Sequence, residues 1–229
     1  MASTLNLRAG AGLRTLTTIA LAVWLVLLAD CARAQSKAAP QTLLQSVRIF
    51  DALVSFPPAS WYTGGDPADS STFSGGQLGA SYAIRQIPKG DFLEAWTRLY
   101  SISGVKLAPG HGQTLDSAAI ASTDSFQRIC SPKRLFAKLI DRDQNSYTTL
   151  FHCESTGNSP GAPGYGPSVG EVGLMRVFLV RDTVVKAIHA WRGALFFVDD
   201  VTTWPVTGEE VNRTIELFAS MTASPAASQ

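Results

Sequence analysis

The segment Gly166-Pro-Ser-Val-Gly170 matches the G-x-S-x-G pattern of serine hydrolases. In those enzymes a strand delivers the serine onto a strained turn, and a helix follows it. Here a loop rich in glycine and proline precedes Ser168, and the residues after it have the pattern of a strand. Asp182 and His189 are the downstream residues that could serve as orienting acid and base. A hydrolase site of Ser168, Asp182 and His189 is therefore the alternative interpretation. The loop before Ser168 and the strand after it predict that Ser168 is not a nucleophile.

The three histidines are the other candidates for acid–base or metal chemistry. His111 lies in the turn Pro109-Gly-His-Gly112, His152 precedes Cys153, and His189 alternates with apolar residues in a predicted strand. Neither H-x-x-x-H nor H-E-x-x-H spacing occurs, so the ligand pattern of known zinc sites is missing. A site assembled from distant segments is the alternative. The sequence predicts no catalytic residue, no metal site and no cofactor.

Two pairs of aspartates could share a proton or hold a cation. Asp141 and Asp143 flank a predicted hairpin tip, and Asp199-Asp200 follows a predicted strand. Aspartates at such places are typical of turns and solvated surface, and we interpret both pairs in that way.

Aromatic residues are the best candidates for binding. Trp61-Tyr62 stands at the mouth of a long loop, and exposed aromatic side chains on loops often anchor a partner. The alternative is that the pair covers one end of the core. Trp191-Arg192 has the same two interpretations, and Arg192 could stack on an aromatic ring or meet a carboxylate.

The first 34 residues have the pattern of a bacterial signal peptide. Arg8 and Arg14 precede an apolar run from 19 to 29, and Ala32-Arg33-Ala34 fits the A-x-A cleavage site before Gln35. A membrane span needs about 20 apolar residues, so this run predicts a cleaved signal. The alternative is a lipoprotein signal at Cys31, although Asp30 departs from the small uncharged residue expected before that cysteine. We expect a periplasmic or secreted protein with no integral membrane segment after cleavage.

Net charge and cysteine content bear on the class of partner and on the presence of a disulfide. The full chain has a net charge of +1, and loss of three arginines and one aspartate with residues 1–34 leaves about −1. This balance does not favour nucleic acid or anionic membrane as a partner. Cys130 and Cys153 then remain, and an even pair in an exported chain predicts a disulfide.

Local patterns predict an α+β fold with a largely antiparallel sheet covered by helices. We expect a flexible leader over 35–49, one domain over 50–223 and a flexible tail over 224–229. The predicted strands cover 52–56, 78–87, 172–180, 184–191 and 196–198, with a hairpin of 135–140 and 147–151 that sets Leu135 opposite Cys153. Helices are predicted from Asp91 to about Gly104, over 115–128, and after a capping box at Thr207. The segment 60–76 is predicted as a loop.

This layout resembles the PsbP/Mog1/DcrB-like group of small α/β proteins. The resemblance rests on the strand and proline break in Leu53-Val-Ser-Phe-Pro-Pro58, on Tyr82-Ala-Ile-Arg-Gln86 leading into the predicted helix at Asp91, and on the strands from Glu171 to Trp191 followed by the helix after Thr207. It covers most of residues 50–222 and is architectural. The resemblance implies a non-enzymatic binding, assembly or chaperone-like factor and transfers no functional residues.

The sequence thus favours an exported, non-enzymatic protein that binds another protein in the cell envelope. A hydrolase built from scattered residues and a small-ligand carrier with a pocket between sheet and helices are the alternatives.

Overall fold

A computed structural model describes residues 44–130, 134–157 and 164–227 of the chain. The predicted signal peptide, its cleavage site and Cys31 therefore lie outside the described residues. In these ranges no helix has the length and apolar character needed to cross a membrane.

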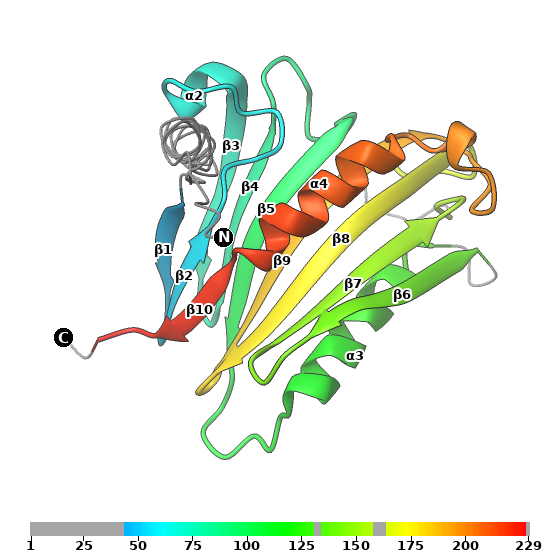
Figure 1. Cartoon of the computed structure of the whole chain (residues 1–229). Helices are drawn as coiled ribbons and strands as arrows, with labels where there is room; N and C mark the ends of the chain where they lie inside the picture. The colour runs from blue at the N-terminus through cyan, green and yellow to red at the C-terminus, as the bar shows by residue number, and fades with distance from the viewer. Residues whose placement is uncertain (1–43, 131–133, 158–163, 228–229) are drawn as a thin grey trace, which may run out of the picture. The chain divides into compact units, whose positions relative to one another are not determined.

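Two antiparallel sheets form the framework of the described structure (Figure 1). The larger sheet has the strand order β3-β4-β5-β9-β8-β7-β6, and the smaller has the order β1-β2-β10. The large sheet consists of β3 (Ser71–Leu78), β4 (Ser81–Pro88), β5 (Arg98–Lys106), β6 (Leu135–Arg142), β7 (Ser146–Cys153), β8 (Val169–Val180) and β9 (Thr183–Ala194). The small sheet consists of β1 (Gln45–Ile49), β2 (Ala52–Phe56) and β10 (Thr222–Pro225).

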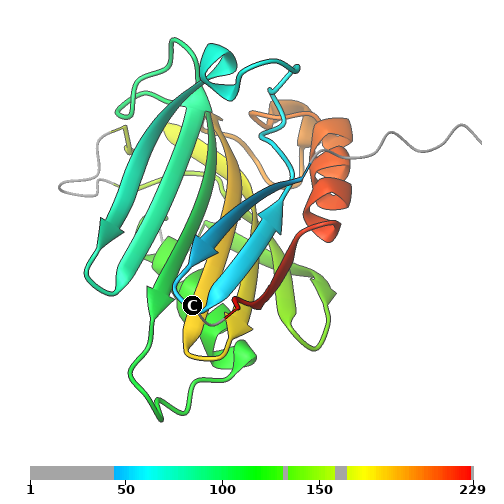
Figure 2. The ribbon, with the colours of Figure 1, turned by 90° about the vertical axis from the view of Figure 1, so that its left-hand side faces the viewer.

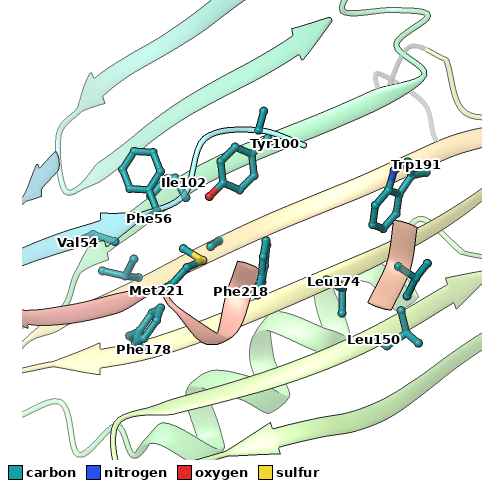
Figure 3. Close-up of a cluster of buried hydrophobic side chains, with 14 of the residues drawn as sticks. Val54, Phe56, Tyr100, Ile102, Leu150, Leu174, Phe178, Trp191, Phe218 and Met221 are labelled. Atoms are coloured by element: carbon teal, nitrogen blue, oxygen red, sulfur yellow. The ribbon is translucent and has the colours of Figure 1, made fainter. Parts of the chain in front are cut away.

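One face of the large sheet carries the main core. Helix α4 (Gly208–Ala219) and the small sheet both lie on this face, as the two ribbon views show (Figures 1 and 2). Their side chains meet those of β5, β8 and β9 in one buried cluster (Figure 3). Tyr100, Trp191 and Phe218 are each 1% exposed within it. Burying aromatic side chains of this size supplies much of the hydrophobic stabilisation.

The opposite face is only partly covered. Helix α3 (Leu115–Gln127) packs over β6, β7 and β8. The ring of Phe126 stacks on that of Phe151, with centroids 4.0 Å apart. Gly173 makes room for this stack, because a Cβ there would lie 2.3 Å from the Phe151 ring.

Local signals placed several elements correctly. The hairpin of β6 and β7 has the predicted register, with Leu135 opposite Cys153. Thr207 caps α4 by accepting a hydrogen bond from the Glu210 amide, at 3.2 Å. Cys130 and Cys153 are joined by a disulfide with Cα atoms 5.6 Å apart, which ties the end of α3 to β7.

The predicted helix from Asp91 is wrong. Residues 89–97 form turns, and β5 follows from Arg98. The Asp91 carboxylate accepts hydrogen bonds from the amide and hydroxyl of Thr97, at 2.7 and 2.8 Å, and so closes a loop instead of capping a helix. The three-and-four spacing of Phe92, Trp96 and Leu99 was misleading, since Phe92 is 71% exposed.

Other boundaries also differ from the predictions. The predicted loop over 60–76 contains the short helix α2 (Pro67–Ser70) and most of edge strand β3, whose side chains are mostly exposed and show no apolar alternation. Residues 196–198 form no strand and lead to the 3₁₀ turn η1 (Val201–Thr203). Strand β1 occupies 45–49 of the predicted leader, and β10 extends into the predicted tail.

The antiparallel sheet of the predicted fold class is confirmed, but the fold contains more β-structure than expected. In the described residues a second sheet does part of the covering that the prediction assigned to helices.

Candidate functional site

The residues of the alternative hydrolase are spread along the sheet. Ser168 precedes β8, Asp182 lies in the turn between β8 and β9, and His189 lies in the middle of β9. Seven residues of strand separate Asp182 from His189, or about 23 Å at the usual rise. Asp182 instead lies 3.5 Å from His111. The structure therefore does not assemble these three residues into a catalytic site.

His189 instead contacts a serine that the sequence did not single out. Its Nε2 lies 2.9 Å from Ser60 Oγ, and Ser60 Oγ donates to Glu210 Oε1 at 3.3 Å. Trp191 Nε1 donates to the same carboxylate oxygen at 3.1 Å. The Ser60 hydroxyl thus lies between the Glu210 carboxylate and His189 Nε2, and the tautomer of His189 sets which atom donates in the second contact.

Among the described residues, His189 lacks the orienting contact that a catalytic histidine needs. A catalytic histidine accepts the serine proton at one nitrogen and donates from the other to a carboxylate. His189 Nδ1 is buried without a hydrogen-bond partner among the described residues. Burial, followed by the charges of Arg98 and Arg213, lowers the pKa of His189 to about 3, so the ring stays neutral. The network links the Ser60 loop to β9 and α4 and has a structural role.

The two aromatic residues of the Ser60 loop differ in environment. Trp61 is 9% exposed, packs against His189 and donates from Nε1 to Ser71 Oγ at 2.9 Å. Tyr62 is half-buried and donates to the Gly65 carbonyl at 2.7 Å. Trp61 therefore belongs to the core and covers one end of it, which is the alternative that the sequence left open. Binding of a partner through Tyr62 stays a prediction.

A groove lined by both apolar and polar side chains lies beside α3. No helix of the described ranges packs on β4, β5 or β9 along this face, and a groove of about 560 Å³ results. Its floor consists of alternate residues of these three strands, α3 and Ile129 form one wall, and the 89–97 turns with Tyr165 close one end. The lining residues are Ala83, Arg85, Leu93, Glu94, Trp96, Leu99, Ser101, Ser103, Ser125, Phe126, Ile129, Tyr165, Glu171, Lys186 and Ile188.

A buried charge cluster closes this end of the groove. The Arg192 guanidinium lies between two rings, 3.5 Å from the Trp96 centroid and 4.1 Å from that of Tyr165. Its Nη2 lies 3.5 Å from Glu171 Oε2. Burial raises the pKa of Glu171 to about 7 against the opposing effect of Arg192. Both contacts that the sequence allowed for Arg192, ring stacking and a carboxylate, are therefore present.

Cations without acidic partners occupy the middle of the groove. Lys186 is half-buried, and burial followed by the charge of Arg128 lowers its pKa. Among the described residues, no ion pair includes Lys186, Arg128 or Arg85. Ser101 is 7% exposed, and its hydroxyl has no hydrogen-bond partner in the same part of the chain. The groove thus combines apolar walls with unpaired positive charge.

Sequence reasoning missed this groove because it misassigned β5. The available signal was the alternation of Leu99, Ser101 and Ser103 with the buried Tyr100 and Ile102, a period of two that is typical of a strand.

Comparisons with known proteins give little further information. No family model matches the sequence, and no curated protein matches it. Among solved structures, the Ran-binding protein Mog1p of Saccharomyces cerevisiae has a TM-score of 0.42 and 9% identity, over 79% of this chain and 95% of that one. PsbP (CyanoP) of Synechocystis sp. PCC 6803 has a TM-score of 0.37 and 8% identity, over 82% of this chain and 97% of that one. Both belong to the group that the sequence resembles, and at these scores they carry no argument about function.

Proposed function

We propose that the chain is an exported, non-enzymatic protein that binds another protein in the cell envelope or outside it. Removal of residues 1–34 would release the domain, and the groove beside α3 would receive a segment of the partner. The single observation that carries the proposal is the uncovered face of β4, β5 and β9, with its apolar lining and unpaired cations.

The form of the groove favours a polypeptide segment over a small ligand. Small-ligand sites bury most of the ligand surface in an enclosed cavity. Here Leu93 and Glu94 on the rim are exposed, and Phe92 next to the rim is 71% exposed. Exposed apolar side chains beside an apolar groove are common where another chain packs.

Absence of catalysis is supported by the histidine environments. A general base needs a titratable group within reach of a substrate. His189 is buried and has no partner at Nδ1 among the described residues, and burial lowers the pKa of His152 to about 4. Glu171 has a raised pKa, but it is buried and Arg192 pairs with its carboxyl group.

Photo-crosslinking in cells tests the proposal. A photoreactive residue replaces Leu93 at the groove rim, and a matched control replaces Leu78 at the β3–β4 turn, which is 85% exposed. We expect one protein adduct from position 93 and none of the same mass from position 78. Ser103→Trp fills the groove floor and should remove the adduct while the melting temperature stays near that of the parent.

The proposal is contradicted if position 93 yields no protein adduct. It is also contradicted if a folded Ser103→Trp variant gives an undiminished adduct, since the partner would then bind elsewhere.

A further inference from the structure

We infer that the segment bound in the groove carries an acidic side chain flanked by apolar ones, and that Lys186 and Arg85 bind its carboxylate. This inference rests on the proposed function and specifies the chemistry of the partner.

The strand register places the two cations over one patch of floor. Arg85 pairs with Ser101, and Ser101 pairs with Ile188, while Ser103 pairs with Lys186. Arg85 and Lys186 are therefore two strands and two residues apart, about 10 Å across the strands and 7 Å along them. Long side chains from these positions can converge on one carboxylate above the two serines.

Among the described residues, the positive charges of Arg85 and Lys186 in this patch have no acidic partner. A half-buried lysine normally has an acidic partner, because burying an unpaired ammonium costs free energy. Lys186 instead has the cation Arg128 as its charged neighbour. Ser101 lines the floor, and its hydroxyl can donate a further hydrogen bond to a bound anion.

The neighbouring surfaces determine what surrounds the carboxylate. Leu99 and Ile188 lie beside the cations on the floor, and Phe126 lies on the α3 wall. At the Trp96 end, Glu171 already neutralises Arg192, and Glu94 adds negative charge at the rim. An acidic group is therefore favoured in the middle of the groove and disfavoured at that end, where apolar side chains can pack on Trp96.

Short peptides test the inference directly. The ¹⁵N-labelled protein is titrated with acetyl-Ala-Leu-Glu-Leu-Ala-amide, with the same peptide carrying Gln in place of Glu, and with dodecanoate. The amide shifts of Ser101, Ser103 and Ile188 report occupation of the groove. We expect the Glu peptide to bind about 10-fold more tightly than the Gln peptide, as one charge-assisted contact gives.

Two variants test whether Lys186 causes the preference for the Glu peptide. Lys186→Met keeps the apolar stem and removes the charge, so it should abolish the preference while Gln-peptide binding remains. Lys138→Met, on the exposed face of β6, should leave the preference unchanged. Melting curves of both variants verify that they are folded.

The outcomes distinguish failure of the inference from failure of the proposed function. Equal affinity for the two peptides overturns the inference and leaves the proposed function standing. If neither peptide shifts the groove amides, the proposed function itself is contradicted, and dodecanoate binding alone would indicate a small-ligand carrier. A preference that survives in folded Lys186→Met overturns the role of Lys186.

Discussion

Replacing His189 with glutamine should weaken the dependence of stability on pH. The pKa of His189 is about 3 in the folded protein, against an ordinary value of 6.5. Below pH 6.5 the unfolded chain binds a proton that the folded chain does not, so stability present above pH 6.5 is lost as the pH falls.

The magnitude follows from the width of this window. From pH 6.5 to pH 5, each pH unit costs about 1.4 kcal/mol for one proton, which gives about 2 kcal/mol in total. Glutamine can keep a hydrogen bond to Ser60 and does not titrate. Wild type should therefore lose about 2 kcal/mol more than His189→Gln between pH 8 and pH 5.

Urea unfolding at the two pH values measures this difference. Glu171 has the opposite sign, because its raised pKa gives stability that is present below pH 4.5 and lost as the pH rises to about 7. Its contribution is the same in both proteins and cancels in the comparison. Ser60→Ala keeps the buried imidazole and should retain the wild-type pH dependence. Equal pH dependence in wild type and His189→Gln would refute the reasoning, since the histidine would then titrate in the folded protein.

Four further predictions concern other parts of the chain. Cys130→Ser should lower the free energy of unfolding by about 3 kcal/mol, measured under oxidising conditions, because the disulfide closes a loop with a sequence separation of 23. Arg192→Met should cost about 3 to 5 kcal/mol in urea unfolding at pH 8, because the buried Glu171 loses its partner, and a loss below 1 kcal/mol would contradict a charged pair. The exported form should begin at Gln35 by N-terminal sequencing, and a lipidated start at Cys31 would exclude this. Ser168→Ala should leave partner crosslinking intact, since Ser168 lies far from His189 in the structure.

The sequence by itself determined the elements whose signals are local. The β6–β7 hairpin, its register, the Thr207 cap of α4 and helix α3 all depend on residues only a few positions apart. The disulfide belongs with them, because the hairpin register already brings Cys153 near the end of α3. Turn composition, capping and side-chain period act over such distances, so they can be predicted from one chain.

Only the tertiary structure decided the strand character of 98–106 and the groove. The spacing of Phe92, Trp96 and Leu99 fits a helix locally, but pairing of β5 with β4 and β9 outweighs that preference. Strand β9 is nearly ninety residues further along the chain, and Ser60 and His189 are 129 residues apart. The segment carries both the helical spacing of Phe92, Trp96 and Leu99 and a period of two after Leu99. Which pattern prevails depends on which faces bury each other across the sheet, and neither segment specifies this alone. The groove exists because β4 and β5 share with the distant β9 one face that α3 does not cover.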